Sequence, residues 1–328
     1  MRNSAGKRLA ALGLAVILPF LCAATWGTAP LDSLDLSDRT DYKLPVDLSV
    51  IEPRANEKAF TDTSYEDSTI SVKITSGRVE DKCDYWVADV IISDPSQMRT
   101  ASASGNFLRS AEMDGVTLCT LLNAVVGLNG DFTFGTEKKG FGYYMRQGTL
   151  YKDQLDTPGH WLCMIMDILL VDEDGDFHIV HNAEKGSITG MQYKGKRILN
   201  SFCFGPALVV DGKAVEDFEG ADAWLNMAST RERSRIAFCQ VDRLHYRIIK
   251  SSGNYNSADM VTTNTGLTLA EFAALCEREG VQTAYNLDGG DSALLYFHND
   301  RVYDNKPNTS LRRLQDVIYF VSAEAHEQ

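Results

Sequence analysis

Two stretches of this 328-residue chain place carboxylates and glycines directly after an apolar segment. In the first, Val281–Leu287 runs into Asp288-Gly289-Gly290-Asp291-Ser292. Glycine lets a ligand approach the main chain closely, and successive N–H groups in such a turn can form an anion-binding concavity. Asp288 and Asp291 add carboxylates, and Ser292 adds a hydroxyl. An ordinary hairpin turn uses the same residue types, so this stretch alone leaves a structural role for Asp288 open.

The second stretch repeats this arrangement earlier in the chain. The apolar segment 124–128 runs into Asn129-Gly130-Asp131-Phe132, so polar groups and a glycine again follow an apolar strand. Asp131 could supply a second carboxylate to the same site. An aspartate that closes its own turn explains Asp131 almost as well, and that alternative stays open.

Three arginines alternate along a predicted strand at 230–237. Arg231, Arg233 and Arg235 would face one side of it, because side chains in a strand alternate with period two. Guanidinium forks suit phosphate and carboxylate groups. The alternative is a solvated strand face whose surface ion pairs contribute little free energy.

The elements that must position these residues are mostly short strands. Several hairpins and only a few helices favour the α+β class, with a mixed, largely antiparallel sheet and a few packed helices in a single catalytic domain. The clearest helix begins at Thr268, which forms a capping box with Glu271, and ends at Gly280. It leads directly into the strand that ends at Asp288.

The N-terminus has the pattern of an export segment. Basic residues precede the apolar run 12–24, which is typical of a secretory signal or an uncleaved anchor, and both alternatives stay open. If residues 9–26 are retained, they could tether the protein to a membrane. We therefore predict an export segment at 1–29, an acidic linker at 30–69 and the catalytic domain at 70–328. The protein is then extracellular or anchored at the cell surface.

Composition excludes some functions and gives no indication of others. The net charge of −13 argues against nucleic acid as a partner, since that recognition uses Lys and Arg to meet phosphates. The histidines and cysteines lack metal-ligand spacing, so we expect no metal and no cofactor. The acidic turn 172–176 is more typical of a solvated hairpin than of a calcium loop. Most of the seven cysteines have apolar neighbours, which favours buried free thiols over a disulfide framework.

Five motifs in order resemble the phosphodiester glycosidase domain family, which includes the lysosomal uncovering enzyme and many bacterial exported proteins. The resemblance covers about residues 70–325. It rests on Asn129-Gly130-Asp131-Phe132, Gly205-Pro206, Arg233-Ser234, Gly266-Leu267-Thr268-Leu269-Ala270-Glu271-Phe272-Ala273 and Asn286–Ser292. The chain departs from the usual family pattern at Glu232, Ala237 and Asp291. Asp291 stands where a third glycine is usual, so it adds a carboxylate beside the expected anion site.

The resemblance implies a hydrolase that cleaves the anomeric C–O bond of a glycosyl-1-phosphodiester, of the N-acetylglucosamine type, on an extracellular glycan. Two carboxylates typically flank the anomeric carbon in glycoside hydrolysis, and Asp288 and Asp131 are the candidates. Arg233 and the N–H groups of Gly289 and Gly290 would stabilise the phosphate. The remaining candidates would bind sugar hydroxyls or hold the carboxylates: Asn129 with its neighbour Gly130, Asn286 and Ser292.

Two functions of other classes remain as alternatives. The domain could be a non-catalytic module that binds a cell-surface glycan, which the Asp291 departure permits. The paired aspartates could instead hold a divalent cation and cleave the P–O bond, as in a metal-dependent phosphodiesterase.

Overall fold

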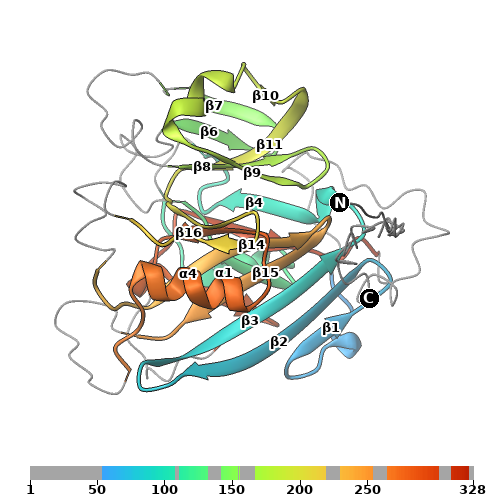
Figure 1. Ribbon diagram of the computed structural model, residues 1–328. Coiled ribbons are helices and arrows are strands. Elements are labelled where there is room, and N and C mark those ends of the chain that lie inside the picture. The colour runs from blue at the N-terminus through green and yellow to red at the C-terminus, as the bar shows by residue number, and fades with distance from the viewer. Residues whose placement is uncertain are drawn as a thin grey trace, which may run out of the picture.

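The computed structural model describes residues 54–107, 111–131, 142–153, 155, 167–218, 230–253, 264–302 and 312–324. Within these residues the chain forms four β-sheets and two α-helices, α1 (Gly115–Leu121) and α4 (Leu269–Arg278) (Figure 1). All strand pairings between the described strands are antiparallel. The predicted α+β class with a largely antiparallel sheet is confirmed.

The largest sheet has eight strands and carries the strand that ends at Asp288. Its order is β1-β2-β3-β15-β14-β16-β12-β13, so β16 lies in the interior of the sheet, between β14 and β12, which are distant from it in sequence. The strands are β1 (Ser64–Glu66), β2 (Ile70–Val79), β3 (Cys83–Ile92), β15 (His245–Ser251), β14 (Arg235–Asp242), β16 (Thr283–Leu287), β12 (Ala207–Val210) and β13 (Lys213–Ala214).

A five-stranded sheet carries the strand that ends at Asn129, and its order is β18-β17-β5-β19-β4. A four-stranded sheet, β10-β11-β8-β9, and a two-stranded sheet, β6-β7, lie together at one end of the molecule (Figure 1). The strands are β18 (Asp300–Arg301), β17 (Leu295–Phe297), β5 (Val126–Asn129), β19 (Asp316–Phe320), β4 (Met98–Ser102), β10 (Gln192–Tyr193), β11 (Lys196–Phe202), β8 (Ile168–Asp172), β9 (Phe177–Val180), β6 (Tyr143–Arg146) and β7 (Thr149–Asp153). The 3₁₀ helices are η2 (Glu57–Ala59), η3 (Pro95–Gln97), η4 (Asn182–Ser187) and η6 (Gly290–Ser292).

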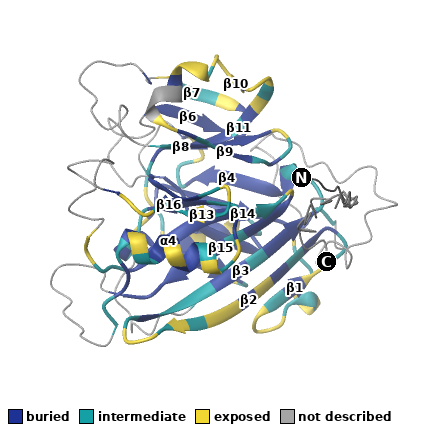
Figure 2. Cartoon of the chain, viewed as in Figure 1, coloured by how far each residue is buried: buried dark blue, intermediate teal, exposed yellow. Residues whose placement is uncertain are grey.

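The central strands are apolar on both faces because both faces of the eight-stranded sheet are covered. Along β14, Ile236 and Phe238 join the large core shared with the five-stranded sheet. The alternate residues Ala237 and Cys239 join a second core beneath α4. Figure 2 shows these strands almost wholly buried, while α4 exposes its outer face. Side chains therefore alternate between two cores, as the period of a strand requires.

Helix α4 forms where the sequence predicts it. Thr268 is the N-cap, and its side chain and that of Glu271 make both hydrogen bonds of the capping box. The apolar face packs against β12 and β13, and Gly280 follows the helix with a φ of 76°. The helix therefore delivers the chain to β16 in the direction that ends at Asp288.

The folded part begins earlier than predicted. Residues 54–69, which we assigned to the acidic linker, contain η2 and β1, and β1 pairs with β2. Tyr65 is completely buried in the large core, and its hydroxyl donates to Asp67 at 2.7 Å. The boundary at residue 70 is therefore too late. The acidic composition gave no indication of β1, because a strand of three residues is stable only when it pairs with another strand, here β2. The predicted export segment lies outside the described residues.

The prediction of buried free thiols is confirmed for the cysteines that the structure describes. None of these takes part in a disulfide, and all are buried: Cys83, Cys119, Cys203, Cys239 and Cys276. Cys22 and Cys163 lie outside the described residues. The described core is therefore held by packing rather than by covalent bridges.

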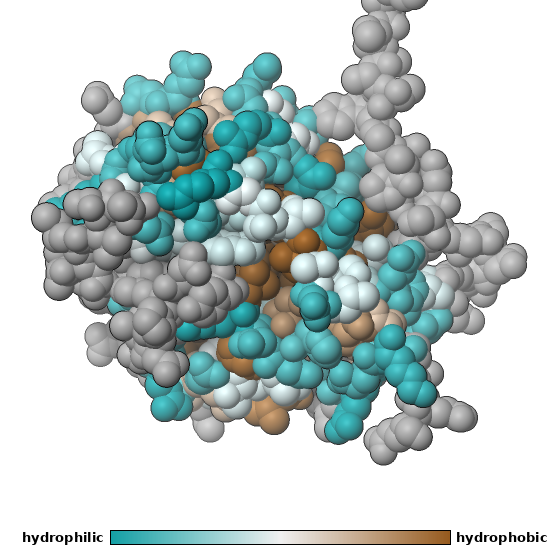
Figure 3. Space-filling view, turned by 90° about the horizontal axis from the view of Figure 1, so that it is seen from below, coloured by the Kyte–Doolittle hydropathy of each residue, from teal (hydrophilic) through white to brown (hydrophobic). Residues whose placement is uncertain are grey.

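The described surface is mostly hydrophilic when the molecule is seen from below (Figure 3). Apolar residues show on this face mainly near its middle, with others at its edges. Neither α1 nor α4, the α-helices of the described part, has the length and apolar character of a membrane-spanning helix.

Candidate active site

Asp288 lies directly after β16, at a turn that packs against the start of β14. The last pair of this ladder is Leu287 with Ile236, so Asp288 follows the end of the pairing. The next residues bend away because Gly290 has a φ of 58° and begins η6. A Cβ on Gly289 would lie 2.5 Å from the carbonyl oxygen of Ser234, so only glycine fits between the two strands there.

One of the two predicted amide donors is already engaged. The N–H of Gly290 donates to the carbonyl of Ser234 at 2.9 Å. The expectation that both glycines present N–H groups to a phosphate is therefore wrong for Gly290, whose amide holds the turn to β14. Gly289 remains the candidate donor of the pair.

The Asp288 carboxylate faces a guanidinium that sequence reasoning missed. Arg312 Nη1 lies 3.3 Å from Asp288 Oδ2, and the side chain of Asp288 is 19% exposed. Burial raises the pKa of Asp288 above its ordinary value, while the hydroxyl of Ser292 and the charge of Arg312 act in the opposite direction. The adjacent arginines at 312 and 313 were the only sequence signal of this contact. A carboxylate at this position is accessible, and it can act as a nucleophile or base.

Asn129 connects the two carboxylate motifs. Its Nδ2 donates to the carbonyl of Asp288 at 3.0 Å, and its Oδ1 accepts from the N–H of Leu294 at 3.1 Å. The side chain is buried, and it joins the end of β5 to both sides of the turn after β16. Asn129 therefore orients Asp288, and the structure does bring the two motifs together.

Asn286 is held on the other side of β16. Its Nδ2 donates to the carbonyl of Gly205 at 2.8 Å, and its main-chain N–H donates to the carbonyl of Pro206 at 3.0 Å. The Gly205–Pro206 peptide bond is cis. Asn286 Oδ1 is buried and has no hydrogen-bond partner among the described residues. Its amide nitrogen therefore supports the chain, and its side chain is too buried to reach a sugar hydroxyl in this structure.

Arg233 lies beside the same turn, although the predicted strand around it begins later. β14 starts at Arg235, and Arg233 forms an isolated bridge with Leu267. Arg235 is buried and donates from Nε to the carbonyl of Leu267 at 3.0 Å, so it holds the chain together. Burial and the nearby Arg233 lower the pKa of Arg235 to about 10. Arg233 is half-buried and remains the candidate for anion binding.

The Asp131 carboxylate lies in a buried cluster of charges. Its Oδ2 lies 3.4 Å from Nη2 of Arg146, which also lies 3.2 Å from Oδ2 of Asp316. The Asn129-Gly130-Asp131 motif needs glycine at position 130, because a Cβ there would lie 2.5 Å from the Asp316 carboxylate. No sequence signal pointed to Arg146, and Asp316 could have been noticed only as an aspartate that begins an apolar strand.

The structure thus links the two candidate carboxylates without placing them in contact. Among the described residues, no hydrogen bond or ion pair joins Asp131 to Asp288, and Asn129 connects their strands. Burial raises the pKa of Asp131 to about 6; the charge of Arg146 lowers it and that of Asp316 raises it. The two carboxylates therefore differ in environment: Asp131 is buried, and Asp288 is partly exposed.

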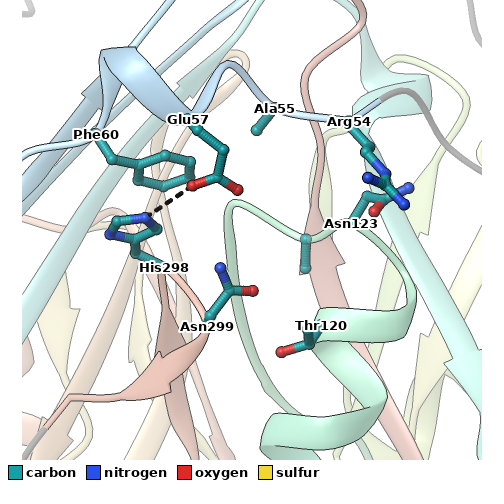
Figure 4. Close-up of a pocket in the computed structure, with 9 residues that line it drawn as sticks. Arg54, Ala55, Glu57, Phe60, Thr120, Asn123, His298 and Asn299 are labelled. Carbon is teal, nitrogen blue, oxygen red and sulfur yellow. Dashed lines mark hydrogen bonds and ion pairs between the residues drawn. The ribbon is translucent and has the colours of Figure 1, made fainter. Parts of the chain in front are cut away.

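A pocket of about 300 Å³ lies at the opposite end of β5, and its position separates it from these residues (Figure 4). Its lining includes Glu57 of η2, Asn123 after α1 and His298 after β17. Asn123 precedes β5 and Asn129 ends it, which places them roughly 17–20 Å apart at the usual rise of a strand. None of the predicted site residues lines this pocket.

The ammonium group of Lys196, from β11, lies among the carboxylates of the acidic turn between β8 and β9. Asp172, Asp174 and Asp176 place carboxylate oxygens within 4.8 Å of one another. Lys196 Nζ lies 2.5 Å from Asp174 Oδ2 and 3.6 Å from Asp172 Oδ2. Asp172 Oδ1 also accepts from the N–H groups of Asp174 and Asp176, as in a hairpin turn. The two main-chain contacts of Asp172 are those of a hairpin turn, but its carboxylate is buried rather than solvated.

Most of the candidate site residues lie in a part of the chain that matches a known protein family. Residues 122–321, more than half of the chain, match the family described as phosphodiester glycosidase. No curated protein matches the chain.

Solved structures resemble this chain at low sequence identity. The catalytic domain of zebrafish N-acetylglucosamine-1-phosphodiester alpha-N-acetylglucosaminidase, auto-inhibited by its pro-peptide, shares the fold and is 13% identical. Its TM-score is 0.57, and the match covers 83% of this chain and 87% of that one. A hypothetical protein from Synechocystis is 15% identical with a TM-score of 0.49, covering 77% and 62%. A protein of Burkholderia pseudomallei described as exported is 14% identical with a TM-score of 0.46, covering 73% and 74%.

Proposed function

Because this chain belongs to the phosphodiester glycosidase family, we propose that it hydrolyses the anomeric C–O bond of a glycosyl-1-phosphodiester. The proposed sugar is of the N-acetylglucosamine type, the sugar named in the zebrafish enzyme that shares the fold. The proposed substrate is a phosphodiester-linked glycan outside the cell, such as an exopolysaccharide.

The observation that carries the proposal is the environment of Asp288. An accessible carboxylate stands at the end of a central strand, 3.3 Å from Arg312 and held through its own carbonyl by Asn129. The amide of Gly289 belongs to this turn, and Arg233 directly precedes Ser234, whose carbonyl accepts from the N–H of Gly290. One negative group for the sugar carbon and several positive groups for the phosphate are what this hydrolysis requires.

The chemistry follows from the charges that develop. As the bond from the anomeric carbon to the phosphate oxygen breaks, its electron pair stays on that oxygen, and the carbon becomes positive. Asp288 either attacks this carbon or removes a proton from the water that does so. Arg233 and Arg312 stabilise the additional negative charge on the departing phosphate.

The proposed location is outside the cytoplasm. The basic and apolar pattern of residues 1–29 supports export, either with cleavage or with residues 9–26 as a membrane tether. A glycan partner is consistent with such a location, and the acidic composition makes nucleic acid an unsuitable partner.

The test is hydrolysis of methyl-phospho-N-acetylglucosamine by the full chain in oxygen-18 water. The proposal expects label in the released sugar, because water attacks carbon. Label in the released phosphate would mean P–O cleavage, and loss of activity in chelator would then identify a metal-dependent phosphodiesterase. Saturable binding of a glycan panel without turnover would identify a binding module instead. The same assay with Asp288→Asn shows whether any turnover depends on this site.

A further inference from the structure

The guanidinium of Arg146 is immobilised beside Asp131. Arg146 is fully buried, and its guanidinium carbon lies 4.2 Å from the ring centroid of Tyr144 and 4.5 Å from that of Phe202. Its Nη1 donates to the carbonyls of Met145, at 3.0 Å, and Ser201. A planar cation in contact with two aromatic rings and bonded to two carbonyls has one available orientation. Nη2 is therefore directed at the carboxylates.

The two oxygens of Asp131 have different surroundings. Oδ2 lies 3.4 Å from Nη2 of Arg146, and it accepts from the main-chain N–H of Cys203 at 3.0 Å. Oδ1 is buried and has no hydrogen-bond partner among the described residues. A proton cannot lie between Oδ2 and two N–H donors without breaking a hydrogen bond. When Asp131 is protonated, the proton therefore belongs on Oδ1.

Asp316 completes the cluster and supplies a second negative group. Its Oδ2 lies 3.2 Å from Nη2 of Arg146, and the hydroxyl of Tyr144 donates to it at 3.4 Å. The main-chain N–H of Gly130 donates to the Asp316 carbonyl at 3.0 Å, which ties Asp316 to the chain next to Asp131. One buried cation between two carboxylates cannot neutralise both of them, and removing the excess charge by protonation is favourable.

The titratable groups that face Asp131 come from several elements of the described structure. Arg146 and Tyr144 belong to β6, Asp316 begins β19, Cys203 follows β11, and Tyr285 belongs to β16. Arg146 is the only cation in this set. Burial is the first cause that raises the pKa of Asp131 to about 6. A proton donor of that pKa matches a phosphate monoester, whose second pKa is about 6, so the transfer is nearly balanced.

We propose that Arg146 and Asp316 are positioning residues that present Oδ1 of Asp131 as the proton donor to the leaving phosphate. This inference rests on the proposed function. Asp131 gives its proton to the phosphate oxygen as the bond from that oxygen to the anomeric carbon breaks. If water attacks the carbon directly, its proton passes to Asp288, which releases it to solvent, and Asp131 is reprotonated from solvent. If Asp288 bonds to the carbon first, water then displaces Asp288 from the carbon, and the water proton returns to Asp131.

The first test is the pH dependence of kcat for the full chain and two variants. An acid must be protonated to act, so activity falls above its pKa. Asp316→Asn removes a negative charge and should move this alkaline limb to lower pH, by about one pH unit or more. Arg146→Met removes the positive charge and should move it to higher pH. Equal limbs in wild type and Asp316→Asn, or a shift to higher pH in Asp316→Asn, would overturn the inference.

The matched control is Asp89→Asn, which removes a carboxylate from a different arginine. Asp89 Oδ1 lies 2.7 Å from Nε of Arg247 and 2.9 Å from Nε2 of His245. This variant should lose stability without moving the alkaline limb. If Arg146→Met does not fold, Asp316→Asn and Asp89→Asn decide the question, because both keep the shape of the side chain.

A second readout does not require turnover. The amide signal of Cys203 in a ¹⁵N–¹H spectrum should titrate with Asp131, since its N–H donates to Oδ2. Its midpoint should fall in Asp316→Asn, and its hydrogen bond should persist below the midpoint. Loss of that hydrogen bond at acidic pH would place the proton on Oδ2 and overturn the inference. A correct amide titration in a protein that hydrolyses no glycosyl phosphodiester would refute the proposed function and leave the geometry of the cluster intact.

Discussion

Replacing Asp131 with asparagine should make the protein more stable at neutral pH, even though the residue is buried in a charged cluster. Burial raises the pKa of Asp131 from 3.8 to about 6. Between these two pH values the folded state holds a proton on Asp131 that the unfolded state has released. Stability is therefore lost as pH rises through this window. The loss amounts to about 3 kcal/mol, at roughly 1.4 kcal/mol for each pH unit between the two pKa values.

The asparagine of the Asp131→Asn variant cannot ionise, so this loss disappears. Its side-chain oxygen can accept from Arg146 and from Cys203, as Oδ2 of Asp131 does. The difference in unfolding free energy, variant minus wild type, should rise by about 2 kcal/mol between pH 4 and pH 7, because part of the total change lies below pH 4. Other carboxylates titrate in this range, but they contribute equally to both proteins and cancel in the difference.

The assay is urea unfolding of both proteins at several pH values, with equal m-values as the check that the same transition is compared. A difference that stays flat with pH would mean that the pKa of Asp131 is near its ordinary value. A difference that falls with pH would mean that Arg146 outweighs burial and holds the carboxylate ionised. Either result would also remove the basis for Asp131 as a proton donor.

Three further predictions concern the turn after β16. Asp288→Asn should reduce kcat by about a hundredfold to ten-thousandfold, measured as released sugar, without loss of unfolding free energy; retained activity would exclude Asp288 from catalysis. Gly289→Ala should cost about 1–3 kcal/mol of unfolding free energy, because its Cβ would lie 2.5 Å from the Ser234 carbonyl. Gly186→Ala is its control, since a Cβ there meets nothing within 4 Å, and equal losses would refute the contact. Arg312→Met removes a charge that lowers the pKa of Asp288, so the acid limb of kcat/KM should move to higher pH, whereas an unchanged limb would mean that the ion pair is absent in solution.

Local patterns were sufficient to predict much of the fold. The features that sufficed involve residues only a few positions apart in the sequence. They are the alternation at 70–74, the capping box of Thr268 with Glu271, and the apolar segments before Asn129 and Asp288. The order of motifs was also sufficient for the family. Residues 54–69 were misassigned because acidic composition is a weak guide when a short strand gains its stability from a partner.

Hydrophobic period and glycine position are local properties, so the amino-acid order was enough to show which residues stand at strand ends. What those residues contact depends on the packing of distant segments. Arg146 and Asp316 are 170 positions apart, and Arg312 and Asp288 are 24 apart, so no periodicity connects them. Sheet pairing placed β5 beside β19 and β17, and this brought Asn129 to Asp288 and turned Asp131 toward Arg146. A carboxylate's chemistry depends on the charges and burial around it, and those are set by packing between segments far apart in the chain.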